Sequence, residues 1–455
     1  MNSGMWGLAA LLVAAPLAAQ DELPIHTTTL DNGLEVIVIE NHAVPLVTIE
    51  LDVKNGAYTE TPEYNGLSHL YEHMFFKGNR TIPNQEEYLE RVNELGAAWN
   101  GTTSTERVNY YITVGVDSLE PGMQFMEDAI RYPLFEQAEL ERERPVVLGE
   151  YDRNESNPFF HLGRATDTLL WSSEYYSHKN VIGNREVINT TTQEKMRTIQ
   201  QRFYVPNNTA LILSGDITTE RGLALARQVF GDWPRGEDPF ATPIPDPPPL
   251  AEPRAVVVEQ PVNTVTVSVN WQGPSVTTDP KSTYVADLLA TALGNPTSKF
   301  YKALVESGLA FGVNFSYFTQ MHVGPIAIQA QTTPDKALEL HRAMLAEVDK
   351  LGDPGYVTTE ELDAAKAEVE VAQIYGREQA SSFAHTVGFW WAVAGLDYYL
   401  GYVDGMQAVT QDDIAEFART YMIGKPHVSG ALIDPESRAA IDLTASDLLA
   451  QEVVQ

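Results

Sequence analysis

His69-Leu70-Tyr71-Glu72-His73 is the stretch that decides how this chain is interpreted. It lies within residues 65–78, an apolar run that ends at Gly78 and is typical of a buried helix. Residues three and four apart share one face of a helix, so His69 and His73 can bind one metal ion with Glu72 beside it. The alternative is a partly buried helix that happens to contain two of the chain's ten histidines.

The order of these residues matches the H-x-x-E-H motif, the reverse of the H-E-x-x-H motif of zinc peptidases. Neutral imidazoles are good zinc ligands, and catalytic zinc usually takes three protein ligands and a water molecule. Glu72 is placed to accept a proton from that water. We therefore expect a third ligand elsewhere in the chain.

An acidic segment downstream offers that ligand. It reads Glu139-Leu140-Glu141-Arg142-Glu143-Arg144-Pro145-Val146-Val147-Leu148-Gly149-Glu150-Tyr151. Together, the H-x-x-E-H motif and this segment resemble the pitrilysin, insulinase and mitochondrial processing peptidase family of zinc metallopeptidases. The resemblance implies one zinc ion per chain with His69, His73 and Glu150 as ligands. It also implies that Glu72 is the general base and that Glu143 orients the metal ligands without binding the metal itself.

The acidic segment departs from the family pattern at two positions. Pro145 removes a backbone donor between the two glutamates and is expected to kink the helix. Gly149 stands where the family usually has a larger residue. If these changes redirect Glu150, Asp152 and Glu155 are the alternative ligands. For Glu143, the alternative is a charge on a solvated helix face.

The resemblance extends along most of the chain. Two strands are expected within residues 33–53, and residues 206–216 resemble the closing strand of one half. Residues 100–111 resemble the family pattern N-A-x-T-S-x-E-x-T-x-Y, a sheet edge to which an extended peptide adds as a further strand. The resemblance makes Asn100 a candidate substrate contact. The alternative is an ordinary polar strand and turn.

Composition is that of a soluble globular protein. The 455 residues are enough for two or more domains, and 44% of them are apolar and 20% charged. The formal net charge of −32 argues against nucleic acid as a partner, because phosphates are bound by Lys and Arg.

Residues 1–20 are predicted to be a secretory signal peptide. Their apolar run is short for a membrane span, and the small residues Ala18 and Ala19 precede a cleavage point near Asp21. The stretch lacks Lys and Arg, so an N-terminal anchor is the alternative. The chain has no cysteine, which excludes disulfides and thiolate ligands. We expect an exported protein, in a bacterial periplasm or outside the cell.

A Pro-rich segment, residues 236–254, is predicted to link two domains. The predicted domains are residues 21–235, which carry the metal motif, and residues 255–455, which do not. Similar strand pairs and similar helix starts in both halves indicate a duplication. The predicted fold class is α+β: two homologous α/β-sandwich domains, each a sheet covered by helices, in a clamshell-like arrangement. Each half is large enough to hold its own core.

The second half departs from the family at a position near the expected substrate. Active single-chain members carry an Arg and a Tyr there, in a motif like L-R-x-x-x-G-L-A-Y. Here Val305 stands in the place of the Arg and Phe311 in that of the Tyr, and neither side chain can donate a hydrogen bond. The family includes pairs in which one subunit carries zinc and the other carries Arg and Tyr. The resemblance therefore implies a heterodimer with a homologous partner subunit; a homodimer is the alternative.

These observations predict a zinc-dependent endopeptidase that hydrolyses extended peptides or unfolded polypeptide segments. The alternative is a non-catalytic or partner-dependent assembly subunit, which binds peptide and metal without turnover of its own. A protein that only stores metal is disfavoured, because metal binding alone does not need the base Glu72.

Overall fold

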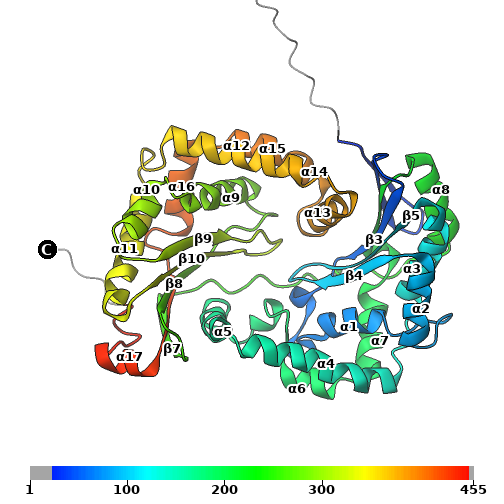
Figure 1. The fold of residues 1–455 in the computed structure, drawn as a ribbon, viewed down its shortest axis with the longest axis horizontal. Helices are drawn as coiled ribbons and strands as arrows, with labels where there is room; N and C mark the ends of the chain where they lie inside the picture. The colour runs from blue at the N-terminus through cyan, green and yellow to red at the C-terminus, as the bar shows by residue number, and fades with distance from the viewer. Residues whose placement is uncertain (1–22, 450–455) are drawn as a thin grey trace, which may run out of the picture.

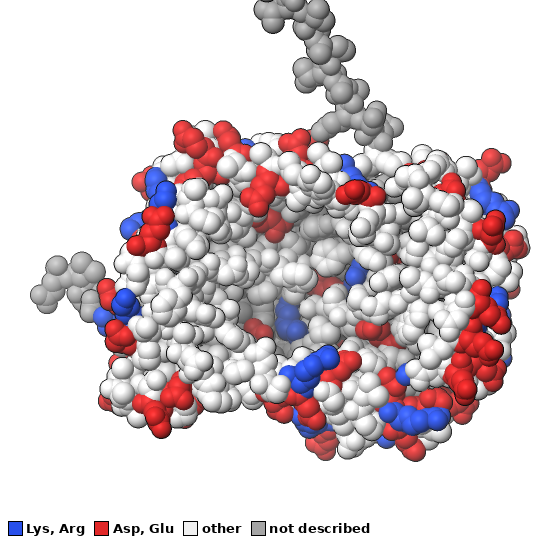
Figure 2. Space-filling view, viewed as in Figure 1, with Lys and Arg blue, Asp and Glu red and all other residues white. Residues whose placement is uncertain are grey.

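The computed structural model describes residues 23–449, so the predicted signal peptide lies outside the described residues. Two β-sheets, each covered by helices, form two halves that lie side by side (Figure 1). The predicted α+β fold of two helix-covered sheets is therefore confirmed. Figure 2 shows a hollow between the halves, with most visible charged side chains on the rim and the outer surface.

The first sheet has six strands in the order β1-β2-β6-β3-β5-β4. Strands β2 and β6 are parallel, and the other neighbours are antiparallel. Its central strands are rich in Val, Ile and Leu because both of their faces are buried. Strand β4 forms one edge. The strands are β1 (Ile25–Thr29), β2 (Glu35–Glu40), β3 (Leu46–Val53), β4 (Ala98–Thr103), β5 (Val108–Gly115) and β6 (Thr209–Gly215).

The described part of the first half has eight α-helices, of which α1, α3 and α8 pack on one face of the sheet. Several begin at a capping side chain: Asn84, Thr192 and Thr218 each accept a hydrogen bond from the backbone N–H three residues ahead. The helices are α1 (Leu67–Phe75), α2 (Gln85–Leu95), α3 (Leu119–Arg131), α4 (Gln137–Glu155), α5 (Pro158–Trp171), α6 (Arg185–Thr190), α7 (Gln193–Phe203) and α8 (Thr219–Phe230).

The second sheet repeats the topology of the first. Its order is β7-β11-β8-β10-β9, which corresponds strand by strand to β2-β6-β3-β5-β4. In both sheets the first of these pairs is parallel and the rest are antiparallel. The strands are β7 (Arg254–Glu259), β8 (Val265–Gln272), β9 (Gly312–Tyr317), β10 (Pro325–Thr332) and β11 (Val428–Ile433).

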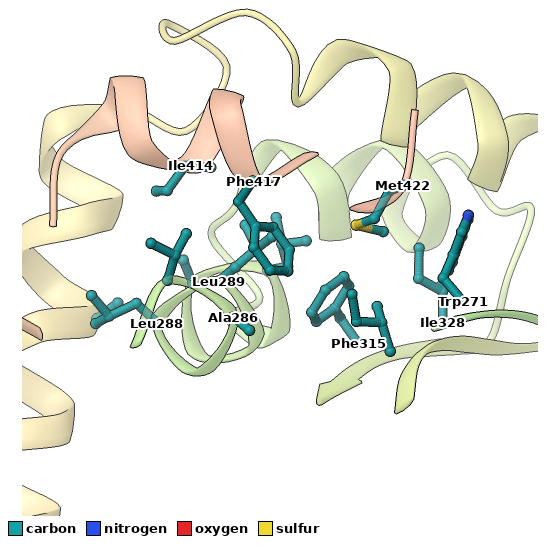
Figure 3. Packing of buried hydrophobic residues seen from close by; sticks show 14 of the residues in the cluster. Trp271, Ala286, Leu288, Leu289, Phe315, Ile328, Ile414, Phe417 and Met422 are labelled. Atoms are coloured by element: carbon teal, nitrogen blue, oxygen red, sulfur yellow. The ribbon is translucent and has the colours of Figure 1, made fainter. Parts of the chain in front are cut away.

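The helices of the second half bury a large apolar core against this sheet. Phe315 and Ile328 of the sheet lie near Phe417 and Met422 in that core (Figure 3). The helices are α9 (Pro280–Gly294), α10 (Lys299–Tyr301), α11 (Ala337–Lys350), α12 (Thr359–Tyr375), α13 (Ala380–Val393), α14 (Leu396–Leu400), α15 (Tyr402–Gln407), α16 (Gln411–Tyr421) and α17 (Pro435–Ile441), with a π-helical turn at Lys302–Glu306.

Each sheet is also covered by one helix from the other half. Helix α13 packs on β3 and β6 of the first sheet, and α5 packs on β11 and β7 of the second. The Trp391 indole donates to Glu35 at 2.7 Å, and the Ser214 hydroxyl donates to the Ala380 carbonyl at 2.8 Å. The two halves are therefore interlocked by an exchange of helices.

This exchange gives the two halves a shared core. Four apolar side chains of the first sheet, Ile37, Ile39, Ala210 and Ile212, belong to the same buried cluster as the core of the second half. On its other face the first sheet packs in a buried cluster made only of residues of the first half. The first half therefore has a core of its own and shares a second one with the other half. The predicted domain boundaries stay a prediction.

The connection between α8 and β7 contains no helix or strand and is mostly exposed. No helix within residues 23–449 is both long and apolar enough to cross a membrane.

Candidate metal centre

Helix α1 begins at a tightly packed glycine. Gly66 has φ 95°, and a Cβ there would lie 2.7 Å from the Cα of Gly183, so a larger residue does not fit. The buried Glu60 carboxylate accepts hydrogen bonds from the N–H groups of Gly66 and Ser68, both at 2.6 Å. Burial raises the pKa of Glu60 to about 7, although these hydrogen bonds oppose the shift. A glutamate thus caps the first turn of α1.

One face of α1 is fixed by aromatic packing. Tyr71 stacks on Tyr204 with ring centroids 3.9 Å apart, and Phe75 stacks on Tyr110 at 3.7 Å. The opposite face carries the polar residues of the motif, His69, Glu72 and His73, which are only partly buried. The spacing of apolar residues in the run therefore directs the H-x-x-E-H side chains toward α4 and β4.

Three predicted ligands converge between α1 and α4. Nε2 of His69 lies 3.4 Å from Oε2 of Glu150, and Nε2 of His73 lies 3.8 Å from the same oxygen. All three ligand atoms lie within 4.8 Å of one another, as binding of one ion requires. The structure thus brings together the residues that the sequence singles out.

The donor set fits a divalent cation such as zinc. Two imidazoles and a carboxylate match the ligand types of catalytic zinc sites and leave one position for water. Burial, followed by the nearby His73, lowers the pKa of His69 to about 4, so this ring is neutral at pH 7, the form that binds metal.

His73 is held in place by a carboxylate and a lysine. Its Nδ1 lies 2.7 Å from Oε1 of Glu143, and Nζ of Lys77 lies 2.6 Å from Oε2 of the same residue. Burial pushes the pKa of Glu143 upward, but the hydrogen bonds with His73 and Lys77 outweigh it and hold the pKa below its ordinary value. A charged Glu143 accepts a hydrogen bond from the Nδ1–H of His73, which leaves the lone pair of Nε2 free to bind a metal.

Helix α4 carries both glutamates on one face despite the two departures. The helix is continuous from Gln137 to Glu155 with Pro145 inside it, and a Cβ at Gly149 would meet nothing within 4 Å. The alternative ligands Asp152 and Glu155 are instead paired with Arg185, at 2.6 and 2.8 Å. Geometry therefore favours Glu150 as the third ligand.

Glu72 lies beside the three ligands and contacts the edge strand β4. The Thr103 hydroxyl donates to Oε2 of Glu72 at 2.7 Å. A Cβ on Gly101 would lie 3.0 Å from Cγ of Glu72, so this part of the strand fits closely against the side chain. Burial raises the pKa of Glu72, because it disfavours the charged carboxylate.

Only every second residue of β4 uses its backbone N–H and C=O groups to bond to β5. The Ser104 N–H donates to the Arg107 carbonyl at 2.8 Å, which makes these two residues a hydrogen-bonded pair. Such pairs alternate along an antiparallel ladder, so Thr102 and Asn100 bond to β5 in the same way.

The residues between them turn their backbone groups away from β5. The N–H and C=O groups of Trp99, Gly101 and Thr103 therefore face the open edge of the sheet. Side chains alternate as well. Gly101 and Thr103 lie on the side of Glu72, whereas the exposed Asn100 lies on the other face of β4.

Comparison with known proteins identifies the family. Residues 35–172 match the family described as "Insulinase (Peptidase family M16)", and residues 190–369 match the "Peptidase M16 inactive domain". The chain belongs to peptidase family M16.

The relatives of this chain differ in how much of their length is similar to it. A protein named "uncharacterized zinc protease" from Rickettsia felis is 25% identical over 406 residues, covering 86% of this chain and 93% of that protein. The zinc protease PqqE of Helicobacter pylori is 26% identical over 399 residues, covering 84% and 86%. Human insulin-degrading enzyme is 28% identical over 187 residues, 40% of this chain and 18% of that enzyme.

Solved structures share the fold. A protease from Helicobacter pylori superposes with a TM-score of 0.82 at 21% identity, covering 91% of this chain and 100% of that one. The first half of the periplasmic protease PqqL from Escherichia coli gives 0.77 at 18% identity, covering 94% and 95%.

The second half of this M16 chain lacks a metal site among its described residues. That agrees with its match to the inactive domain of the family. Val305 packs against the core of the second half, whereas Phe311 is 61% exposed.

Three functional contacts were missed from the sequence: the glutamate cap Glu60, the lysine Lys77 and the hydroxyl of Thr103. Lys77 directly follows the apolar run and Thr103 lies in the segment assigned to the sheet edge, so both were within the motifs. Their partners, Glu143 and Glu72, lie 66 and 31 residues away along the chain, and only the folded structure shows the contact.

Proposed function

We propose that this M16 chain is a zinc-dependent endopeptidase that hydrolyses extended peptides or unfolded polypeptide segments. The observation that carries the proposal is the convergence of His69, His73 and Glu150 beside the carboxylate of Glu72. Relatives named zinc proteases support the same reaction class.

The residues around the centre have separate tasks. Zinc, when bound, supplies a Lewis acid that activates water and polarises a carbonyl. Glu72 accepts the proton of the attacking water and returns it to the leaving amine. Glu143 and Lys77 keep the His73 ring oriented, which keeps the ligands preorganised.

The substrate class follows from the edge of β4. An extended peptide that adds as a further strand would bond to the backbone groups of Trp99, Gly101 and Thr103, next to Glu72. Backbone hydrogen bonds depend little on the side chains of the peptide. We therefore propose that the chain accepts extended peptides of many sequences. We propose Asn100 as a contact from the opposite face of the same strand.

We further propose a partner subunit of the same family. Val305 and Phe311 cannot donate hydrogen bonds to a developing oxyanion, and losing one such donor typically costs about 10²–10³ in turnover. A homologous subunit with Arg and Tyr would supply the donors in a heterodimer. An exported, periplasmic location fits the N-terminal sequence and the periplasmic protease PqqL among the structural neighbours.

Metal analysis tests the ligand assignment. Purified chain is expected to contain one zinc ion, and His69→Ala, His73→Ala or Glu150→Ala should each lower the zinc content. Glu72→Gln should retain zinc and abolish hydrolysis. Full zinc retention in Glu150→Ala would contradict the assignment and point to Asp152 or Glu155.

Activity with and without a partner separates peptidase from assembly subunit. We expect little hydrolysis of a quenched fluorescent peptide by the chain alone, and strong hydrolysis after addition of a homologous subunit that carries Arg and Tyr. Replacing that Arg by Ala should remove the gain. Zinc-loaded chain that remains inactive with every such subunit would favour the non-catalytic alternative.

A further inference from the structure

A single hydrogen bond joins the proposed base to the proposed substrate edge. The 2.7 Å contact between Thr103 Oγ1 and Glu72 Oε2 has the length of a hydrogen bond to an ionised oxygen, about 2.5–2.7 Å. Within residues 23–449, no second hydrogen bond to the Glu72 carboxylate is formed. One carboxylate oxygen is therefore held by the protein, and the other, Oε1, is available for proton transfer.

The geometry restricts a side chain that would otherwise be mobile. A glutamate has several rotatable bonds, and holding it in one rotamer costs conformational entropy that a fixed hydrogen bond can offset. Threonine is suited to this task because its β-branch limits χ1, so the hydroxyl direction follows from the strand backbone. Gly101 lies against the same side of Glu72, where a Cβ would be 3.0 Å from Cγ of the glutamate.

The backbone of Thr103 has a second role in the same place. Its N–H and C=O face the open edge of β4, where the proposed substrate strand would pair. A peptide bonded to this edge would immobilise the residue that orients the base. Substrate register and base orientation are thereby linked through one residue.

We infer that Thr103 is a positioning residue for Glu72, which its hydroxyl holds in the orientation that accepts a proton from the attacking water. This inference deepens the proposed peptidase function and rests on it. It assigns no contact with the reacting atoms to Thr103 itself.

Two substitutions at Thr103 distinguish the effect of the hydroxyl group from the effect of the side chain's shape. Thr103→Val keeps the β-branch and removes the donor, and Thr103→Ser keeps the donor. We expect Thr103→Val to lower kcat by about 10- to 100-fold, with KM and zinc content unchanged. Thr103→Ser should recover most of the loss. The assay uses the full chain, together with its partner subunit where hydrolysis requires it.

The neighbouring threonine provides a matched control. The Thr102 hydroxyl donates to Asn109 on the other face of β4, away from Glu72. Thr102→Val should leave kcat within about twofold of the wild type, although it removes the same group from the same strand. An equal loss of kcat in Thr102→Val would mean that strand packing rather than the Glu72 contact is responsible, and would overturn the inference.

Crystal structures give a readout that does not depend on activity. In wild type the Glu72 carboxylate should adopt one rotamer, and in Thr103→Val it should adopt several or move away from the strand. An unchanged Glu72 in Thr103→Val, or equal losses of kcat in the Val and Ser variants, would refute the inference. Zinc-loaded wild-type chain that hydrolyses no peptide, either alone or with a homologous subunit that carries Arg and Tyr, would refute the proposed function instead. The crystallographic comparison would still decide the role of Thr103.

Discussion

At the scale of single residues, the candidate metal centre is asymmetric. Nδ1 of His73 is bound to Glu143, which is itself bound to Lys77. Nδ1 of His69 is buried and has no hydrogen-bond partner among the described residues. The His73 ring is therefore oriented by polar contacts, whereas the His69 ring depends on packing and on the position of α1.

Neutralising Glu143 should weaken metal binding. Glu143→Gln keeps the shape of the side chain but loses the charge that orients His73 and pairs with Lys77. We expect zinc affinity, measured by competition with a chromogenic chelator, to fall by about 10- to 100-fold. Glu141→Gln, on the exposed side of the same helix, is the control and should bind zinc as the wild type does. Equal affinities in all three proteins would rule out a supporting role for Glu143.

Asp287 on α9 should make stability depend on pH far from the metal centre. Burial raises its pKa from the ordinary 3.8 to about 7, although a hydrogen bond from Tyr402 opposes the shift. The folded state thus holds the proton more tightly than the unfolded state. The stabilisation is full below about pH 3.8 and is lost as pH rises to about 7, by at most about 1.4 kcal/mol per pH unit.

Urea unfolding of Asp287→Asn at several pH values measures this effect. The variant should gain stability relative to wild type between about pH 4 and pH 7, and the difference should level off above the pKa of about 7. Asp363→Asn, an exposed position on α12, should show no such trend. A difference that is constant across this pH range would show that Asp287 is not protonated in the folded chain.

At the scale of elements, α13 depends on a close approach to β3. Gly388 lies so near to Asp52 that a Cβ would be 2.3 Å from its Oδ2. On the same helix, Nδ1 of His385 lies 2.5 Å from Glu50, and the Arg107 guanidinium donates to the His385 carbonyl at 3.0 Å. Helix α13 therefore packs on the first sheet through the close approach at Gly388 and is held there by polar contacts of His385.

Gly388→Ala should weaken the packing of α13 on β3. The added methyl group must displace Asp52 or the helix, and such overpacking typically costs about 1–3 kcal/mol, read as a lower free energy of unfolding in urea. Gly163→Ala on α5 is the matched control, because a Cβ there meets nothing within 4 Å. It should be neutral or stabilise the chain by up to about 1 kcal/mol. Equal stability of the two variants would mean that α13 moves freely over the sheet.

The elements also show how far sequence reasoning reaches. The apolar run that ends at Gly78 predicts helix α1, and the shared face of Glu143 and Glu150 follows from their spacing of one heptad. Pro145, where a kink is expected, lies inside the continuous helix α4. The residue is exposed, so water can bond the carbonyl that loses its backbone partner. The helix exchange and the contact of Thr103 with Glu72 join distant segments, which no local pattern encodes.

At the scale of the whole molecule, the two halves should not separate when the connection between them is cut. Proteolysis is expected within residues 236–253, which are mostly exposed. The fragments should still co-elute in size-exclusion chromatography, because α5 and α13 each pack on the sheet of the other half. They should part only in denaturant.

Expression of the halves as separate chains extends this test. Residues 23–235 alone lack α13 and should be aggregated or poorly folded, and addition of residues 254–449 should restore a soluble complex. Zinc should follow the first fragment. A first half that is monomeric and stable alone would contradict the shared core.

The exchange of helices also sets an order of events during synthesis. The Ser214 hydroxyl cannot bond to the Ala380 carbonyl until that residue, 166 positions further along the chain, has been synthesised. At about 5–20 residues per second, a ribosome needs roughly 10 to 30 seconds to make that interval. Throughout it, the apolar side chains of the first sheet that pack in the shared core have no second half to pack against. Native folding of the first half therefore awaits the near-complete chain, and the nascent protein needs shielding from aggregation until α13 has emerged.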